Sequence, residues 1–164
     1  MKLARLATLV PAIALVALAG CSPAPTTAAE VGPTTISEAE LSAAYDGCSE
    51  LGFQVTRAAV LSPLVIGEAA RQVARENDVD TSQLAEVLAS DPQIAPFMAN
   101  EGCARVGEAS GLLTLLSAQM EQDEWVSAVV ESDIQVNPRY GTWDEKSGTI
   151  GGSGSISVPA AAGS

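Results

Sequence analysis

Residues 36–41 are Ile36-Ser37-Glu38-Ala39-Glu40-Leu41, and they carry two independent signals for the start of a helix. Ser37 and Glu40 have the spacing of a capping box, in which each side chain accepts a hydrogen bond from the other residue's backbone N–H. Ile36 and Leu41 flank this box as a hydrophobic staple. The stretch therefore predicts a helix that begins directly after Ser37.

Helical spacing continues from this start towards Gly52, which is a plausible stop. The apolar stripe consists of Leu41, Ala44, Tyr45, Cys48 and Leu51. A second helix is predicted from about Thr56 to Asn77, where Pro63 either opens the regular part or kinks it.

The next part of the chain predicts shorter helical elements. Asp80 and Gln83 have capping-box spacing for a helix to about Ala89, and Asp91-Pro92 predicts a short turn that carries Ile94, Phe97 and Met98. Two more helices are expected, at Cys103–Gln122 and around Trp125–Val130. Gly107 and Gly111 lie one helical turn apart, which would let another helix approach closely.

After Asp133 the periodicity changes, because Ile134 and Val136 alternate with polar residues. This alternation predicts a short strand. The fold class is therefore mainly α: a small bundle of about five helices with a short strand near the C-terminal end.

The N-terminal 20 residues have the layout of an export signal. Lys2 and Arg5 precede the 14 mostly apolar residues of 6–19, a stretch too short to span a bilayer as a helix. The sequence Leu18-Ala19-Gly20-Cys21 resembles the bacterial lipobox. This resemblance implies recognition of residues 18–20 by the signal peptidase and a diacylglycerol anchor on Cys21 that holds the protein in membrane lipid. The expected location is the cell membrane, on its extracytoplasmic face; the alternative is an ordinary secretory signal that leaves Cys21 as a free thiol.

Composition divides the remaining chain into three parts. Residues 21–35 are rich in Pro, Thr and Ala and are expected to form a disordered tether, and residues 145–164 are expected to form a disordered Gly, Ser and Ala tail. Residues 36–144 are enough for one small helical domain with its own core.

The charge balance excludes some partners. Removal of the leader leaves six basic residues against 20 acidic ones, a net charge of −14. Binding to nucleic acid or adhesion to anionic lipid needs clustered Lys and Arg, which this chain lacks. Asp78 with Asp80, and Asp123 with Glu124, lack the spacing of an EF-hand loop and are expected to be solvated helix ends, so no metal and no cofactor is predicted.

With Cys21 assigned to lipid, Cys48 and Cys103 remain as a pair outside the reducing cytosol. A disulfide between them is the favoured interpretation, and two buried free thiols are the alternative.

The chain offers few residues that could act as catalytic groups. The chain has no histidine and no Gly-x-Ser-x-Gly motif. Glu68 and Glu108 could act as paired carboxylates, but carboxylates at helical spacing are usually solvated. We therefore expect no enzymatic activity.

Residues 136–144 are Val-Asn-Pro-Arg-Tyr-Gly-Thr-Trp-Asp. This run, closing a helical domain that opens with residues 36–41 after a lipobox, resembles actinobacterial lipoproteins with a SurA-like N-terminal domain. The resemblance implies a strand near the N-terminus that pairs with the strand before the closing motif. The chain departs from the family pattern in residues 30–33, Glu-Val-Gly-Pro, where proline weakens a strand. It also has no room for a prolyl isomerase domain.

Two functions are compatible with these features. One is a chaperone-like holdase that binds unfolded or extended segments of exported proteins, with Phe97, Met98, Tyr140 and Trp143 as client-binding candidates. Tyr140 and Trp143 could instead pin the closing segment onto the bundle. The other function is a structural adaptor that docks one envelope partner.

Overall fold

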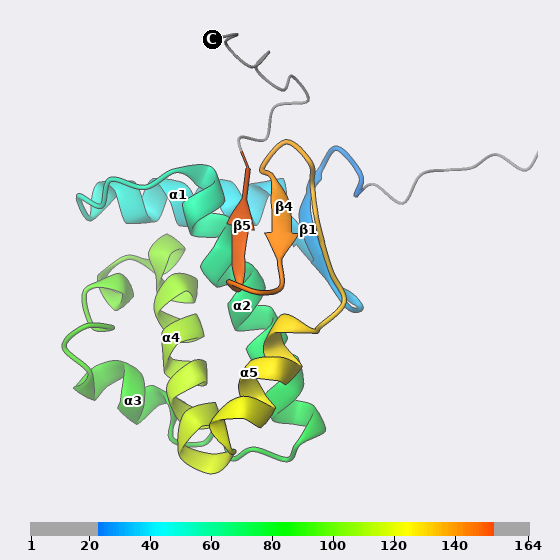
Figure 1. Cartoon of the computed structure of the whole chain (residues 1–164). Helices are drawn as coiled ribbons and strands as arrows, with labels where there is room; N and C mark the ends of the chain where they lie inside the picture. The colour runs from blue at the N-terminus through cyan, green and yellow to red at the C-terminus, as the bar shows by residue number, and fades with distance from the viewer. Residues whose placement is uncertain (1–22, 153–164) are drawn as a thin grey trace, which may run out of the picture.

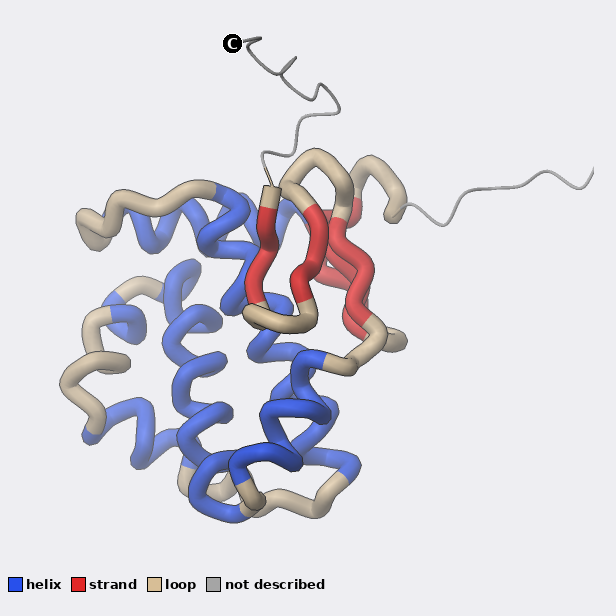
Figure 2. Tube along the Cα trace, viewed as in Figure 1, coloured by secondary structure: helices blue, strands red, loops and turns tan. Residues whose placement is uncertain are grey.

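The structure is a computed structural model, and it describes residues 23–152. They form a helical body with strands along one side (Figures 1 and 2). The helices are α1 (Glu38–Glu50), α2 (Arg57–Glu76), α3 (Leu84–Ser90), α4 (Glu101–Gln119) and α5 (Gln122–Val130), with a 3₁₀ turn η1 (Phe97–Ala99) before α4. The strands are β1 (Thr27–Val31), β2 (Thr34–Ser37), β3 (Ile134–Val136), β4 (Thr142–Asp144) and β5 (Thr149–Gly151). The predicted mainly α class is confirmed, with more strands than expected.

The N-terminal strands correct the predicted tether. Residues 27–31 and 34–37 form β1 and β2, and the sheet order is β2-β1-β3 with both pairs antiparallel. Pro33 does not interrupt a strand, because it lies with Gly32 in the two-residue turn between β1 and β2, where Gly32 has a φ of +51°. A positive φ followed by proline is compatible with a type II′ hairpin turn. The pairing of β1 with β3 is the one implied by the resemblance.

The C-terminal boundary also differs from the prediction. Residues 149–151 were expected in a disordered tail but form β5, which pairs with β4. The folded domain therefore extends from β1 to β5, beyond the predicted limits of 36 and 144 at both ends. β5 also packs on α2, where the Ile150 backbone N–H donates to the Ser62 hydroxyl at 3.1 Å, and local composition does not reveal such a long-range contact.

The two helices predicted nearest the N-terminus, α1 and α2, are confirmed. Ser37 and Glu40 form the predicted capping box, and Ile36 and Leu41 are fully buried. In Glu40, burial tends to raise the pKa, but hydrogen bonds from the Ser37 backbone and hydroxyl and from Arg105 outweigh it, so the pKa is lowered. α2 has Thr56 as its N-cap and Asn77 as its C-cap, and Pro63 lies inside it.

The predicted capping box of α3 is wrong. The N-cap of α3 is Gln83, and it makes no side-chain capping bond. Asp80 instead accepts a hydrogen bond from the Ser82 backbone N–H at 2.9 Å, so its carboxylate closes a local turn rather than a helix end.

The core lies where α2 crosses α1, α4 and the sheet (Figure 1). Its largest fully buried side chains include Leu61, Leu112 and Leu116. α2 and α4 approach closely at Gly67, where a Cβ atom would lie 2.9 Å from the Cβ of Ala109.

The predicted disulfide is confirmed. Cys48 of α1 and Cys103 of α4 are bonded, with Cα atoms 4.8 Å apart, and both residues are buried. The two cysteines are 55 residues apart in the chain, and the bond fixes the N-terminal end of α4 against α1.

The predicted signal peptide and the lipid-anchor site, Leu18-Ala19-Gly20-Cys21, lie outside the described residues. Among the helices that are described, none combines the length and the apolar character that a membrane crossing requires.

Candidate binding site beneath α3

Residues 80–99 contain α3 and η1 and form a segment that packs mainly on α4; we call it the α3–η1 segment. The two glycines predicted to allow a close approach receive it. A Cβ atom at Gly107 would lie 2.9 Å from the sulfur of Met98, and one at Gly111 would lie 2.8 Å from a methyl group of Leu88. The glycines therefore make a notch on α4 that the apolar side chains of the α3–η1 segment fill.

α3 is nevertheless weakly attached. None of its seven residues is buried, and its contact residues Leu84 and Leu88 are only half-buried. A seven-residue helix is too short to be stable alone, so its attachment to α4 depends on these few side chains. α3 therefore belongs to the part of the fold with low local stability, whereas Ile94, later in the same segment, is buried against Gly107.

A cavity of about 320 Å³ opens between α2, α3 and α4. Its lining includes the apolar side chains of Val79, Leu84 and Leu112 and the basic residues Arg71 and Arg75. The cavity adjoins the surface that α3 covers, because Leu84 lines the cavity and also contacts Gly111. Together they form a candidate site for an apolar side chain on an extended polypeptide.

Glu68 differs from the sequence-based expectation of a solvated carboxylate, because it is only 5% exposed. Its carboxylate accepts hydrogen bonds from Thr34 of β2 at 3.1 Å and from Arg71 at 2.6 Å. Arg71 also reaches Glu108 at 3.5 Å, so an arginine separates the two carboxylates that were considered as a catalytic pair. This arrangement holds β2, α2 and α4 together, and we assign it a structural role.

We expect Glu68→Ala to lower the free energy of unfolding by about 2 kcal/mol, because it removes a buried acceptor that binds half-buried donors on two elements. Urea unfolding measures this change. Glu108→Ala is the matched control: its side chain is 35% exposed and its ion pair is longer, so the expected loss is about 0.5 kcal/mol. Equal losses for the two variants would contradict the structural role of Glu68.

The four client-binding candidates fall into two separate groups. Phe97 and Met98 belong to η1 and contact Gly107, whereas Tyr140 and Trp143 follow β3. Phe97 also stacks on Phe53, with ring centroids 4.9 Å apart. Phe53 was missed in the sequence, where it has no periodic neighbour beyond the Gly52 helix stop.

Tyr140 and its neighbours fasten the N-terminal segment. The Tyr140 hydroxyl donates to Glu38 of α1 at 2.6 Å, and Arg139 donates to the carbonyl of Pro25 at 2.5 Å. Burial, and then the hydrogen bond to Glu38, raise the pKa of Tyr140, so its hydroxyl remains a donor at neutral pH. The buried Asn137 donates to the carbonyl of Thr27 at 2.9 Å.

Trp143 packs on the core and donates its indole N–H to the carbonyl of Val130 at 3.3 Å. We name residues 137–143 the closing clamp, since they hold β1 and the ends of α1 and α5. These contacts favour the interpretation that Tyr140 and Trp143 pin the closing segment.

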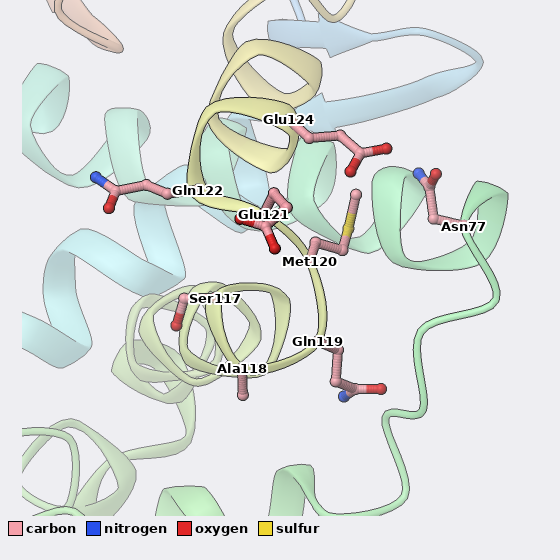
Figure 3. A pocket seen from close by; sticks show the side chains of 8 residues that line it. All are labelled: Asn77, Ser117, Ala118, Gln119, Met120, Glu121, Gln122 and Glu124. Carbon is pink, nitrogen blue, oxygen red and sulfur yellow. The ribbon is translucent and has the colours of Figure 1, made fainter.

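A second cavity, of about 670 Å³, lies at the end of the helical body between α2 and the α4–α5 connection. In Figure 3, the side chains of Asn77 and Glu124 point toward each other, and the Met120 side chain lies below Glu124 in this view. Its lining is polar and includes Glu121 but no basic residue. Within residues 23–152, no group of three or more Asp, Glu or Cys residues is arranged to hold a metal ion.

Comparison with known proteins adds no relative: no family model, curated protein or solved structure matches this chain.

Proposed function

We propose that this protein is an extracytoplasmic lipoprotein, anchored through Cys21, that acts as a holdase for unfolded or extended segments of exported proteins. A disulfide between Cys48 and Cys103 suits an oxidising compartment outside the cytosol. The pairing of β1 with β3 agrees with a SurA-like N-terminal arrangement. The proposed domain has no isomerase activity.

The observation that carries this proposal is the weak cover over an apolar surface. Among the large apolar residues of 23–152, only Val126 reaches 36% exposure, so the folded domain displays no extensive apolar face. The α3–η1 segment covers the notch at Gly107 and Gly111 without a single buried residue in α3. A client side chain would replace Leu84 and Leu88 on α4 when this segment moves away.

Aggregation of chemically unfolded proteins, followed by light scattering, tests the proposal. A fragment of residues 22–164 retains all five strands, and we expect it to suppress aggregation of several unrelated clients at low molar excess. No suppression by a folded, monodisperse fragment would overturn the holdase and would leave the structural adaptor, which predicts saturable binding to one envelope partner.

A variant of the notch tests the site. Gly111→Val would force Leu88 and Leu84 away from α4, and an overpacking cost of about 1.4 kcal/mol would raise the open population about tenfold. We therefore expect this variant to suppress aggregation at a lower molar ratio and to speed hydrogen exchange in α3.

The matched control is Gly151→Val, because a Cβ atom at Gly151 meets no atom within 4 Å. Leu88→Ala provides an independent way to loosen α3. Circular dichroism checks that each variant is folded. Unchanged aggregation kinetics in both Gly111→Val and Leu88→Ala, with faster exchange in α3, would exclude the surface beneath α3 as the client site.

A further inference from the structure

The closing clamp fixes the chain very close to the proposed anchor. The backbone N–H of Thr27 donates to the carbonyl of Ala24 at 2.8 Å, and Arg139 holds the carbonyl of Pro25. Only Ser22 and Pro23 separate Cys21 from Ala24. Three Cα–Cα steps span at most about 11 Å, so a lipidated Cys21 cannot be far from the clamp.

The surface around the clamp carries little charge for so acidic a protein. Residues 23–29 and 134–143 contain no acidic residue and one basic residue, Arg139. The Arg139 guanidinium lies 3.7 Å from the carboxylate of Glu38, which compensates its charge. We call residues 23–26 and 137–141 the anchor face.

The opposite end of the domain is strongly acidic. Residues 76–80 and 119–124 contain no basic residue, and their acidic residues are Glu76, Asp78, Asp80, Glu121, Asp123 and Glu124. These two stretches lie together, because the side chain of Gln119 bonds to the backbone N–H and carbonyl of Asp80 at 3.0 and 2.9 Å. We call them the acidic end.

α2 runs between the two ends of the domain (Figure 1). Its 20 residues make it about 30 Å long, which sets the approximate distance between the anchor face and the acidic end. The anchor face therefore differs from the acidic end in two ways: it carries less charge, and a short stretch of chain connects it to Cys21.

We propose that the anchor face lies against the lipid headgroups of the membrane and that the acidic end points away from it. This orientation rests on the proposed lipidation of Cys21. The short connection brings the anchor face to the bilayer, and the negative potential of anionic lipids repels the acidic end. Because Val79 and Thr81 line the cavity beneath α3, that cavity opens on the side that is distant from the membrane.

Energy transfer to the bilayer tests this orientation in the full-length lipidated protein. Donor dyes are placed on Thr26→Cys in the anchor face or on Gln122→Cys at the acidic end, both exposed positions, while Cys48 and Cys103 stay bridged. The vesicles contain phosphatidylcholine, phosphatidylglycerol and an acceptor-labelled lipid. We expect the transfer efficiency from residue 26 to exceed that from residue 122 at least about twofold, given a separation near the length of α2.

A second variant tests the short connection itself. Insertion of 20 Gly and Ser residues after Ser22 adds a flexible chain of about 25 Å root-mean-square length, so transfer from residue 26 should fall. Equal transfer from the two positions, or unchanged transfer after the insertion, would overturn the proposed orientation.

The proposed orientation can fail while the proposed function stands, and the measurements distinguish the two cases. Mass spectrometry that finds no acyl group on Cys21 would overturn this orientation together with the anchoring half of the proposed function. Equal transfer from an acylated protein would overturn the orientation alone, since suppression of aggregation is measured on the soluble fragment.

Discussion

We expect reduction of the Cys48–Cys103 disulfide to lower the free energy of unfolding by about 4 kcal/mol, according to the chain-entropy relation for a sequence separation of 55 residues. The bond restricts the unfolded chain, and reduction restores that freedom. For a domain of this size the loss corresponds to a decrease in Tm of about 15 °C.

Thermal unfolding of residues 22–164 with and without reductant measures the effect. This fragment lacks Cys21, so thiol titration under denaturing conditions should find no free thiol before reduction and two after it. The double variant Cys48→Ala/Cys103→Ala is the control, and its Tm should not respond to reductant. Two titratable thiols in freshly purified, exported protein would contradict the disulfide.

The parts of the fold that could be predicted from sequence are those with local signals. The capping box at Ser37 and Glu40 and the N-cap at Thr56 act through neighbours three residues away, and both helices begin where they were expected. The Cys48–Cys103 disulfide could be predicted because the assignment of Cys21 to lipid left only these two cysteines to pair, in a compartment expected to lie outside the reducing cytosol.

Only β3 was predicted from its own residues, by the alternation of Ile134 and Val136, and the other strands could not be predicted in the same way. β1 has the sequence Thr-Ala-Ala-Glu-Val, and its first three residues are all buried, so it lacks the alternation of a half-buried strand. Its position depends on β3 and on Asn137, which lies 110 residues from Thr27 in the chain. Composition alone therefore suggested a tether.

The candidate site was only partly visible in the sequence. The glycine pair at 107 and 111 predicted a close approach, but nothing local identified Leu84 and Leu88 as the side chains that fill the notch. Glu68 was expected at the surface because helical spacing does not distinguish a solvated carboxylate from one that accepts bonds from Thr34 and Arg71. In each case the missing information is the packing of distant elements.

The second large loss of stability is expected from a substitution at the contact between α1 and α4. A Cβ atom at Gly102 would lie 2.3 Å from the backbone carbonyl oxygen of Ala43, so Gly102→Ala requires the helices to separate. The disulfide at the adjacent Cys103 opposes this separation. We expect the free energy of unfolding of the oxidised protein to fall by about 3 kcal/mol, whereas Gly151→Ala, which meets no neighbouring atom, should change it by less than about 0.5 kcal/mol.

Urea unfolding of Gly102→Ala in the oxidised and reduced states separates a local clash from a general loss of stability. If the disulfide holds the two helices together, reduction lets α1 move away from α4, and the substitution should cost less in the reduced protein. The two perturbations would then be non-additive by about 1 kcal/mol, as expected for neighbours that share a backbone contact. Equal costs in the two states would contradict this coupling, because they would show that the α1–α4 contact adjusts to a methyl group whether or not the bond is present.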